Sequence, residues 1–395
     1  MAEIRKPAIK ITQGRQSLFI LSLTVRDLML DNFYRVDALD VREGTGTQRL
    51  LKTPRAKALC RDIMEMEENN EEFLPTSVFF ATQGEINYDE DTKELFFNTE
   101  PSARVCPLDV VDGQHRLRGL ELAVQTSKDK ERKKNFLNFP IIVAIAPKMN
   151  EIRRRLQFIT VNTKQEPVNR GVKEAMIAQF THDIDRYSET TNDFWLPSWI
   201  AKKAEVGKEQ RAINIAIKLN DAEDSPWYQR IQLASENKNE RHIILQQTFC
   251  RSVSQFLLSP SHPIHNPSFN ETKKFVILNN FWKAVDELCV EHDDDVDSRA
   301  GSVVFKNAGL DFFHGIFSYI LLLLANNRQY QVEVIKDCMT SAEEYLPPEW
   351  EDILTPKYWK KGNREGASGL TKGTIASATA AFYKALQEAH TPDES

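Results

Sequence analysis

Residues 108–120 have the sequence LDVVDGQHRLRGL, in which an apolar run ends at Asp112-Gly113 and a helical pattern follows. The pattern predicts a strand, a tight glycine turn and a helix. Gly113 lets the backbone approach an anion closely, and the first turn of a helix offers free N–H groups at its positive end. His115 and Arg116 add side-chain donors, and arginine suits bidentate phosphate contacts. The stretch therefore predicts a site for phosphate groups.

Asp112 lies just before this turn, where a carboxylate can hold a divalent metal on bridging phosphate oxygens or orient a water molecule. The same spacing also suits an ordinary strand–turn–helix, in which Asp112 caps the helix and Arg116 lies in solvent. Spacing alone gives the two interpretations about equal weight.

The segments around this stretch predict an α+β domain followed by helices. The predicted elements of the first half are strands at 18–23 and 139–146, a hairpin at 77–98, and helices at 55–67, 117–126 and 151–160. After about residue 172 strand signals fade and long helical patterns take over. Since 395 residues exceed what one core usually supports, we expect two domains. These are a mixed-sheet domain at 15–172 and an α-helical domain at 173–395, which ends in a basic, Trp-containing segment.

Composition limits the functional classes. A net charge of −6 gives no overall bias toward nucleic acid, so any such contact needs a local basic face. The five cysteines lie far apart without a CxxC pair, which disfavours a disulfide framework or a zinc site. No apolar signal-peptide region follows Met1–Lys10, and the most apolar stretch, Ile316–Ala325, is about half a membrane span. We therefore expect a cytoplasmic protein.

Two motifs carry a resemblance to a known family. Residues 112–119 (DGQHRLRG) resemble the signature of DGQHR-domain proteins, which include the DndB and DpdB families. Residues 158–165 (FITVNTKQ) resemble a second segment of that family, and Gln48-Arg49, Arg55 and residues 305–309 are similar more loosely. The resemblance covers about residues 15–330. It implies an N-terminal domain like those of ParB and sulfiredoxin.

The resemblance also implies an ATP site. Its nucleotide-binding residues would be Gly113, Gln114, His115, Arg116, Asn162, Thr163, Lys164 and Gln165. Within this set, Lys164 would neutralise phosphate and Asn162 would contact the base or ribose. The implied catalytic residues are Asp112, His115 and Arg116, with Asp112 also holding Mg²⁺. By itself a turn rich in Asn and Thr is common, so the roles at 162–165 depend on the resemblance.

Three further groups of residues leave alternatives open. A basic cluster could follow a DNA backbone, although a charge run is more often a solvated face; its members are Arg153, Arg154, Arg155, Arg170 and Lys173. The segment 350–364 interleaves aromatic and basic residues, which suits stacking on bases and packing onto the helical domain equally. His262 and His265 have a metal-like gap weakened by Pro263, and the acidic run 293–295 predicts a solvated loop.

Two functions from different classes fit these observations. DndB-like proteins are linked to DNA phosphorothioation, and DpdB-like proteins to 7-deazaguanine insertion and ATP hydrolysis. The first hypothesis is an ATP-binding, ATP-hydrolysing accessory protein of such a bacterial DNA-modification system. It would act with DNA and the system's other proteins, with homo-oligomerisation left open. Because no Walker A motif occurs, it would be a non-P-loop ATPase. The second is a non-catalytic DNA-binding transcriptional regulator of the modification genes. A nuclease is disfavoured, since no PD-(D/E)xK-type cluster is evident.

Overall fold

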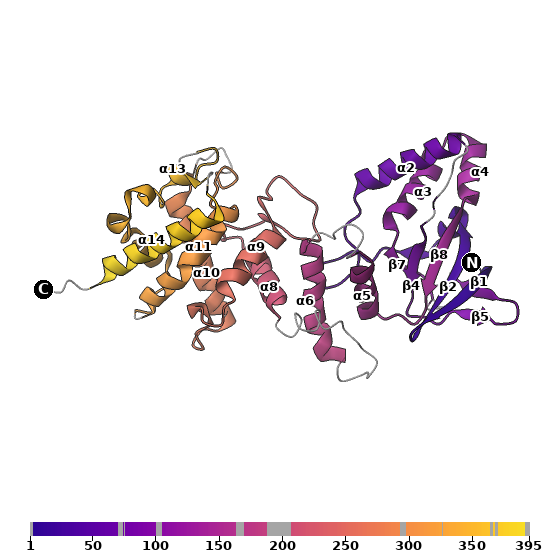
Figure 1. Ribbon diagram of the computed structural model, residues 1–395, viewed down its shortest axis with the longest axis horizontal. Coiled ribbons are helices and arrows are strands. Elements are labelled where there is room, and N and C mark those ends of the chain that lie inside the picture. Colours follow the sequence, from indigo (N-terminus) through magenta and orange to yellow (C-terminus); the bar gives the residue numbers. More distant parts are fainter. Residues whose placement is uncertain are drawn as a thin grey trace. The chain divides into compact units, whose positions relative to one another are not determined.

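The computed structural model (Figure 1) describes residues 3–69, 74, 76–99, 105–162, 170–187, 207–292, 298–325, 327–363, 366–367 and 370–391; of these, the side chains at 162, 170 and 182–187 are not described. The chain divides into two compact units, Met1–Met176 and Ile177–Ser395. Helix α6 (Arg170–Tyr187) crosses the division. Unit 1 combines a mixed sheet with helices and unit 2 is largely helical, so the predicted α+β class is confirmed.

Unit 1 is built on an eight-stranded sheet of order β3-β7-β4-β8-β2-β1-β6-β5. Its strands are β1 (Glu3–Gln13), β2 (Gln16–Thr24), β3 (Tyr34–Arg35), β4 (Val78–Ala81), β5 (Asn87–Asp89), β6 (Glu94–Asn98), β7 (Leu108–Asp112) and β8 (Pro140–Ala146). Its helices are α1 (Val25–Leu28), α2 (Thr53–Glu68), α3 (Gln114–Thr126), α4 (Lys130–Asn138) and α5 (Glu151–Asn162). The pairs β3–β7 and β4–β8 are parallel, and the other pairs in the sheet are antiparallel.

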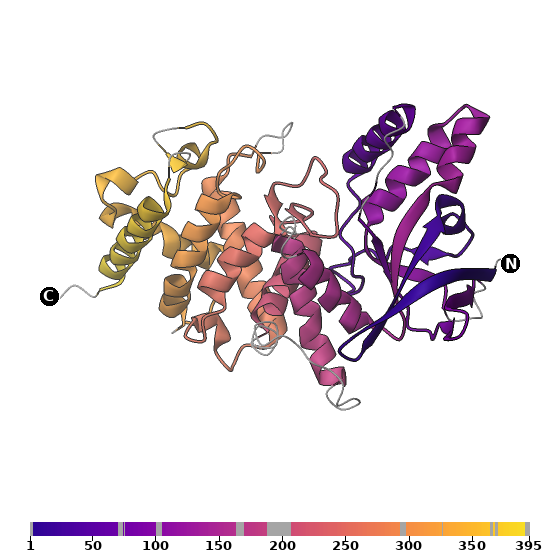
Figure 2. The same cartoon turned by 45° about the vertical axis from the view of Figure 1, so that its right-hand side comes forward.

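The two faces of this sheet have different environments, because side chains alternate along each strand. One face holds the main core of the unit, where Phe80, Val143 and Ile145 pack with Leu117 and Leu120 of α3. Helices α2, α3 and α4 lie on this side of the sheet (Figures 1 and 2). The other face carries a row of residues in register across five strands: Asp112, Phe79, Ala144, Ile20 and Ile9. The part of this row near Asp112 forms the floor of the pocket described below.

The structure differs from the sequence-based expectations at two places in unit 1. Strands β5 and β6 form a hairpin within 77–98 as predicted, but β4 pairs with β7 and β8 instead. The sheet begins at Glu3 rather than after residue 15, because β1 pairs with both β2 and β6.

Unit 2 packs helices around aromatic side chains. Its main helices are α8 (Lys208–Asp221), α9 (Gln246–Ser252), α10 (Glu271–Cys289), α11 (Asn307–Leu324), α12 (Val332–Thr340), α13 (Pro356–Trp359) and α14 (Lys372–His390). Trp227 packs edge-on against Phe249, Trp282 and Phe305, with ring centroids about 5 Å apart. Such pairs combine a large buried area with a favourable ring geometry. They fix the centre of the unit.

Two sequence alternatives in unit 2 are decided by packing. Trp359 is fully buried against Phe312 and Phe313, and its Nε1 donates to the carbonyl of Ile353 at 2.6 Å, so this tryptophan belongs to the core. Within the described part of the chain, α11 is the one helix long and apolar enough to cross a membrane. Most of that helix is buried inside the unit, as a core helix would be.

Candidate functional site

Gly113 allows α3 to begin immediately after β7. It is the N-cap residue of α3 and has a φ of 105°, a backbone conformation that side chains with a Cβ rarely adopt. A Cβ built on Gly113 would lie 3.1 Å from the side chain of Val78 on β4, so a side chain there would also require Val78 to move by a few tenths of an ångström. The strand–turn–helix predicted from 108–120 is therefore confirmed.

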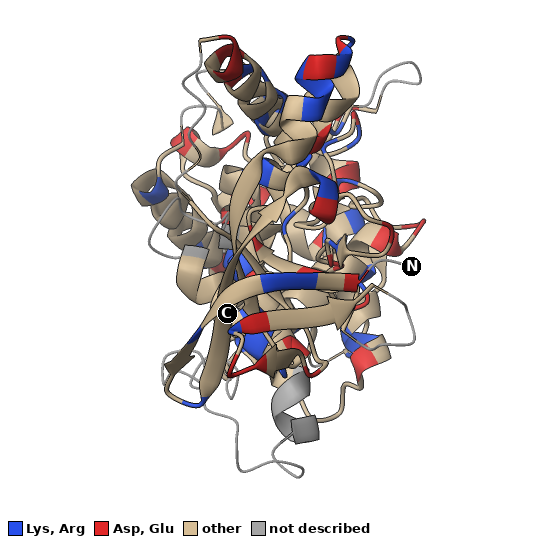
Figure 3. Ribbon diagram, turned by 90° about the vertical axis from the view of Figure 1, so that its right-hand side faces the viewer, with Lys and Arg blue, Asp and Glu red and all other residues tan. Residues whose placement is uncertain are grey.

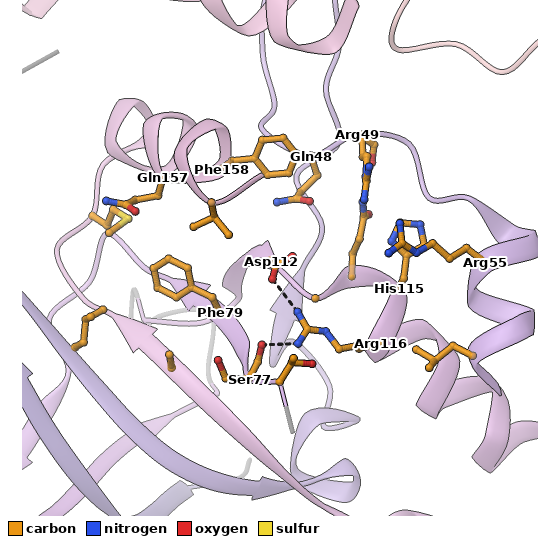
Figure 4. Close-up of a pocket in the computed structure, with 18 of the residues that line it drawn as sticks. Gln48, Arg49, Arg55, Ser77, Phe79, Asp112, His115, Arg116, Gln157 and Phe158 are labelled. Carbon is orange, nitrogen blue, oxygen red and sulfur yellow. Dashed lines mark hydrogen bonds and ion pairs between the residues drawn. The ribbon is translucent and has the colours of Figure 1, made fainter. Parts of the chain in front are cut away.

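A cavity of about 1240 Å³ opens beside this turn (Figure 4). The described residues that line it all belong to unit 1 and come from the β1–β2 hairpin, the 48–62 segment, the second face of the sheet, the start of α3 and α5. Polar and cationic side chains gather around Arg49, Arg55, His115 and Arg116. The apolar side chains in the wall are Leu18, Ala58, Leu59, Phe79, Ala144, Met149, Phe158 and Val161. The wall also includes Gln13, Gln16, Asp62, Thr76 and Gln157. This division suits a ligand with an anionic end and a flat apolar end.

The Arg116 side chain is held at the edge of the cavity by two hydrogen bonds (Figure 4). Its Nη1 donates to the carbonyl of Ser77 at 2.7 Å and its Nη2 to Oδ2 of Asp112 at 2.7 Å. The guanidinium is 18% exposed, so it does not extend into solvent. Asp112 does not cap α3, because no side-chain capping bond is present at its N-terminus. The ordinary strand–turn–helix interpretation placed Asp112 as a helix cap and Arg116 in solvent. The structure shows neither of these two arrangements.

His115 is buried and neutral. Its Nε2 accepts a hydrogen bond from the main-chain N–H of Lys52 at 3.2 Å, which places the proton of the neutral ring on Nδ1. Burial, followed by the nearby charges of Arg49, Arg55 and Lys52, lowers the pKa of His115 to about 4. The convergence of these cations on one buried imidazole indicates a region that favours anions.

We expect acid to destabilise unit 1 partly through His115. The folded-state pKa lies below the ordinary value of 6.5, so the unfolded chain binds more protons between pH 6.5 and about 4. Stability is full above pH 6.5 and is lost as pH falls through this window, by about 1.4 kcal/mol per pH unit for one proton. Hydrogen exchange of the α3 amides from pH 7 to 4.5 measures this. His115→Gln should reduce the slope by one proton, and an unchanged slope contradicts the assignment.

Comparison with known proteins identifies the family of unit 1. A family model described as "DndB: DNA-sulfur modification-associated" matches residues 6–184. Residues 6–184 belong to the DndB family. No curated protein and no solved structure matches the chain. The predicted membership of the DndB type is confirmed, and the family associates the chain with DNA phosphorothioation. The finer likeness to ParB and sulfiredoxin stays a prediction.

The DndB-family domain brings some of the predicted site residues together. Asp112, Gly113, Gln114, His115 and Arg116 all line the cavity. Residues Thr163–Gln165 lie outside the described residues, as does the side chain of Asn162. The preceding helix α5 supplies Gln157, Phe158 and Val161 to the cavity wall.

The predicted DNA-binding cluster is corrected at two positions. Arg154 and Arg155 are each 3% exposed and form ion pairs within the domain, with Asp109 and Glu151 respectively. A buried, paired guanidinium cannot contact a DNA backbone at the surface. The other members remain as predictions: Arg153 and Lys173 are partly exposed and have partners within the chain, and the Arg170 side chain is outside the described residues.

The basic charge of α4 is partly offset by acidic residues of α2. Basic and acidic residues lie side by side on α2 and α4 (Figure 3). Arg132 on α4, for example, pairs with Glu67 and Glu68 on α2. Such interspersed charges are typical of a solvated surface.

Several cavity residues carried only a weak signal in the sequence. Arg49 and Arg55 precede and begin α2, and the looser resemblance at Gln48-Arg49 and Arg55 was the one sign of their role. Ser77 contributes its main-chain carbonyl, which no residue type could indicate. Phe79 reaches the cavity because β4 lies between β7 and β8, a pairing that the sequence pattern did not predict.

The described residues contain no group of three His, Cys, Asp or Glu side chains able to hold a metal ion. Asp112 immediately precedes the turn at Gly113 and is paired with Arg116. In unit 2, His262 uses its Nδ1 to accept from the N–H of Ile264, and the centroids of the His262 and His265 rings are 6.4 Å apart. The acidic run 293–295 lies outside the described residues.

Proposed function

We propose that this DndB-family protein is an accessory protein of DNA phosphorothioation that binds, and hydrolyses, a nucleoside triphosphate in the cavity of unit 1. The observation that carries the proposal is the convergence of Arg49, Arg55, Arg116 and the N-terminus of α3 on one side of a cavity whose other side is apolar. An anionic chain attached to a flat ring system matches this division of the walls. ATP is the triphosphate that the family resemblance favours.

Each group at the anionic end would have a separate role. Arg116 would donate to phosphate oxygens in competition with Asp112, and Arg49 and Arg55 would add positive charge. The main-chain N–H groups at the start of α3 have no partners within the helix and can also donate. His115 would donate from Nδ1 as a neutral ring, since its Nε2 already accepts from Lys52.

Mg²⁺ fits this site only as a complex with the nucleotide, whose phosphate oxygens supply part of its ligands. Among the described residues, two carboxylates line the cavity, Asp112 beside the turn at Gly113 and Asp62 on α2, and Mg²⁺ bound through one or two carboxylates takes its remaining ligands from phosphate oxygens and water. Bound in this way, the ion would neutralise charge that develops on the phosphates. Asp112 would hold the ion or orient the attacking water, and either role would release Arg116 toward the phosphates.

Residues Asn162, Thr163, Lys164 and Gln165 stay in the proposal as further nucleotide contacts, because they follow directly on the cavity-lining part of α5. DNA and the other proteins of the phosphorothioation system are the proposed partners. Arg153, Arg170 and Lys173 are the proposed contacts to the DNA backbone.

The test is nucleotide binding by isothermal calorimetry, with ATP, CTP and GTP, with and without Mg²⁺ and duplex DNA. We expect Arg116→Met to weaken ATP binding by about tenfold to a hundredfold, because charged hydrogen bonds to phosphate are lost. A steady-state phosphate-release assay on the same variant should show a matching loss of hydrolysis.

Arg118→Met is the matched control. Arg118 lies on the same helix, pairs with Glu121 and does not line the cavity, so its loss should leave ATP binding unchanged. If the wild-type chain binds none of the three nucleotides, or if both arginine variants behave alike, the proposed site is wrong.

A further inference from the structure

Gln114 has a buried oxygen without a partner. It is the first residue of α3, is 5% exposed and lines the cavity. Its Nε2 donates to the main-chain carbonyl of Arg49 at 3.1 Å. Its Oε1 accepts no hydrogen bond from any described residue and has almost no accessible surface, so a donor from the cavity reaches it only after a small movement of the Gln114 side chain or a neighbour. Buried polar atoms are nearly always paired, so an unpaired one in a cavity wall indicates a group that a ligand supplies.

The hydrogen bond to Arg49 fixes which end of the amide is the oxygen. The reverse orientation would set the amide oxygen against a carbonyl oxygen, and neither atom can donate. Two other glutamines of the wall are held in the same way. Gln48 donates from Nε2 to the carbonyls of Val110 and Val111, both at 2.8 Å, and Gln16 donates to that of Pro147 at 2.8 Å. In all three side chains the nitrogen is bound to the protein and the oxygen is the end left to accept.

This geometry changes the role expected of Gln114 within the phosphate-binding turn. Phosphate oxygens are acceptors, so an oriented amide oxygen repels them. The neighbouring cations and the α3 N–H groups suit phosphate, whereas Gln114 requires a hydrogen-bond donor. In a nucleotide the donors are the sugar hydroxyls and the amino groups of the base.

We propose that Gln114 selects the ligand by accepting a hydrogen bond from a sugar hydroxyl, so that the cavity prefers a ribonucleotide to a deoxyribonucleotide. The inference rests on the proposed function. The sugar is favoured over the base because it is bonded directly to the phosphate chain and Gln114 begins the helix that holds the phosphates. The apolar wall formed by Phe79 and Phe158 accommodates the base. A site that must satisfy a buried acceptor discriminates against an analogue that lacks the donor.

The test compares dissociation constants for ATP, 2′-deoxy-ATP, 3′-deoxy-ATP, ITP and inorganic tripolyphosphate, measured by calorimetry on the full chain. We expect the wild-type chain to bind ATP at least about tenfold more tightly than one of the two deoxy analogues. Gln114→Leu should abolish this preference and leave the affinity for tripolyphosphate unchanged. Gln114→Glu loses the donor to the Arg49 carbonyl and adds negative charge beside the phosphates, so it should lower the affinity for every triphosphate and for tripolyphosphate.

Gln125→Leu is the control, because Gln125 is an exposed glutamine on the same helix and does not line the cavity. It should leave the preference intact. The sugar assignment is overturned if the wild-type chain binds ATP and both deoxy analogues equally, or if Gln114→Leu keeps the preference. It is also overturned if Gln114→Leu changes the preference for ATP over ITP but not the preference for ATP over the deoxy analogues. In that case the donor is the amino group of the base. Absence of binding to ATP and to tripolyphosphate is a different result, because it removes the proposed function itself.

Discussion

Replacing Asp109 with Asn is expected to destabilise unit 1 by about 3–5 kcal/mol, because it leaves a buried positive charge without its counter-ion. Asp109 on β7 is 3% exposed and pairs with two arginines. One is Arg154 on α5, which is equally buried, and the other is Arg35, whose Nε lies 2.5 Å from Oδ1. Arg35 retains access to solvent, but Arg154 does not.

Hydrogen exchange and tryptophan fluorescence measure this effect in separate parts of the chain. All six tryptophans lie after residue 194, so their fluorescence reports on the second half of the chain. Amide exchange at β7 and α3 reports on unit 1. We expect Asp109→Asn to accelerate exchange at β7 and α3 and to leave the urea midpoint of the fluorescence transition unchanged.

Two further variants control for the loss of a charge. Glu131→Ala removes an exposed partner of Lys134 on α4 and should cost less than about 1 kcal/mol. The double variant Asp109→Leu with Arg154→Met removes both buried charges and should recover most of the loss. If Asp109→Asn costs no more than Glu131→Ala, the ion pair does not hold α5 against the sheet.

Replacing Gly46 with Ala is expected to destabilise unit 1 by about 3 kcal/mol through overpacking. A Cβ on Gly46 would lie 1.9 Å from the carbonyl oxygen of Ala38, and the φ of +79° disfavours any side chain there. The neighbouring backbone cannot move freely, because Thr47 and Gln48 both donate their N–H groups to the carbonyl of Asp37, at 2.9 and 2.8 Å. Since Gln48 and Arg49 line the cavity, the variant should also weaken nucleotide binding. Hydrogen exchange across 37–52 measures the loss of stability, and calorimetry with ATP measures the loss of binding.

Gly44→Ala is the matched control for this substitution. Gly44 lies two residues away with a similar φ of +64°, but a Cβ there would meet no atom within 4 Å. It should cost only the backbone strain, about 1–2 kcal/mol. Equal losses in the two variants would show that backbone conformation, and not the contact with Ala38, requires Gly46.

The sequence by itself determined the local elements of the site. The apolar run of β7, the glycine at 113 and the helical pattern of α3 follow from residue type and periodicity, which act over a few neighbouring residues. The same applies to the buried strand β8, to helix α2 and to the change from sheet to helices along the chain. The motifs in these elements were also enough to indicate the DndB family.

Only the tertiary structure decided which side chains meet. Arg116 holds the carbonyl of Ser77, 39 residues away, and Arg154 lies buried beside Asp109 although its sequence context suggested an exposed basic run. The partner that fixes Gln114 is a main-chain carbonyl 65 residues away. Periodicity predicts which face of an element is buried, but the partner of each polar side chain depends on strand order and on loops that bring distant backbone together. The strand–glycine–helix turn at 112–116 is thus encoded locally, whereas the shape of the cavity around it is set by the fold.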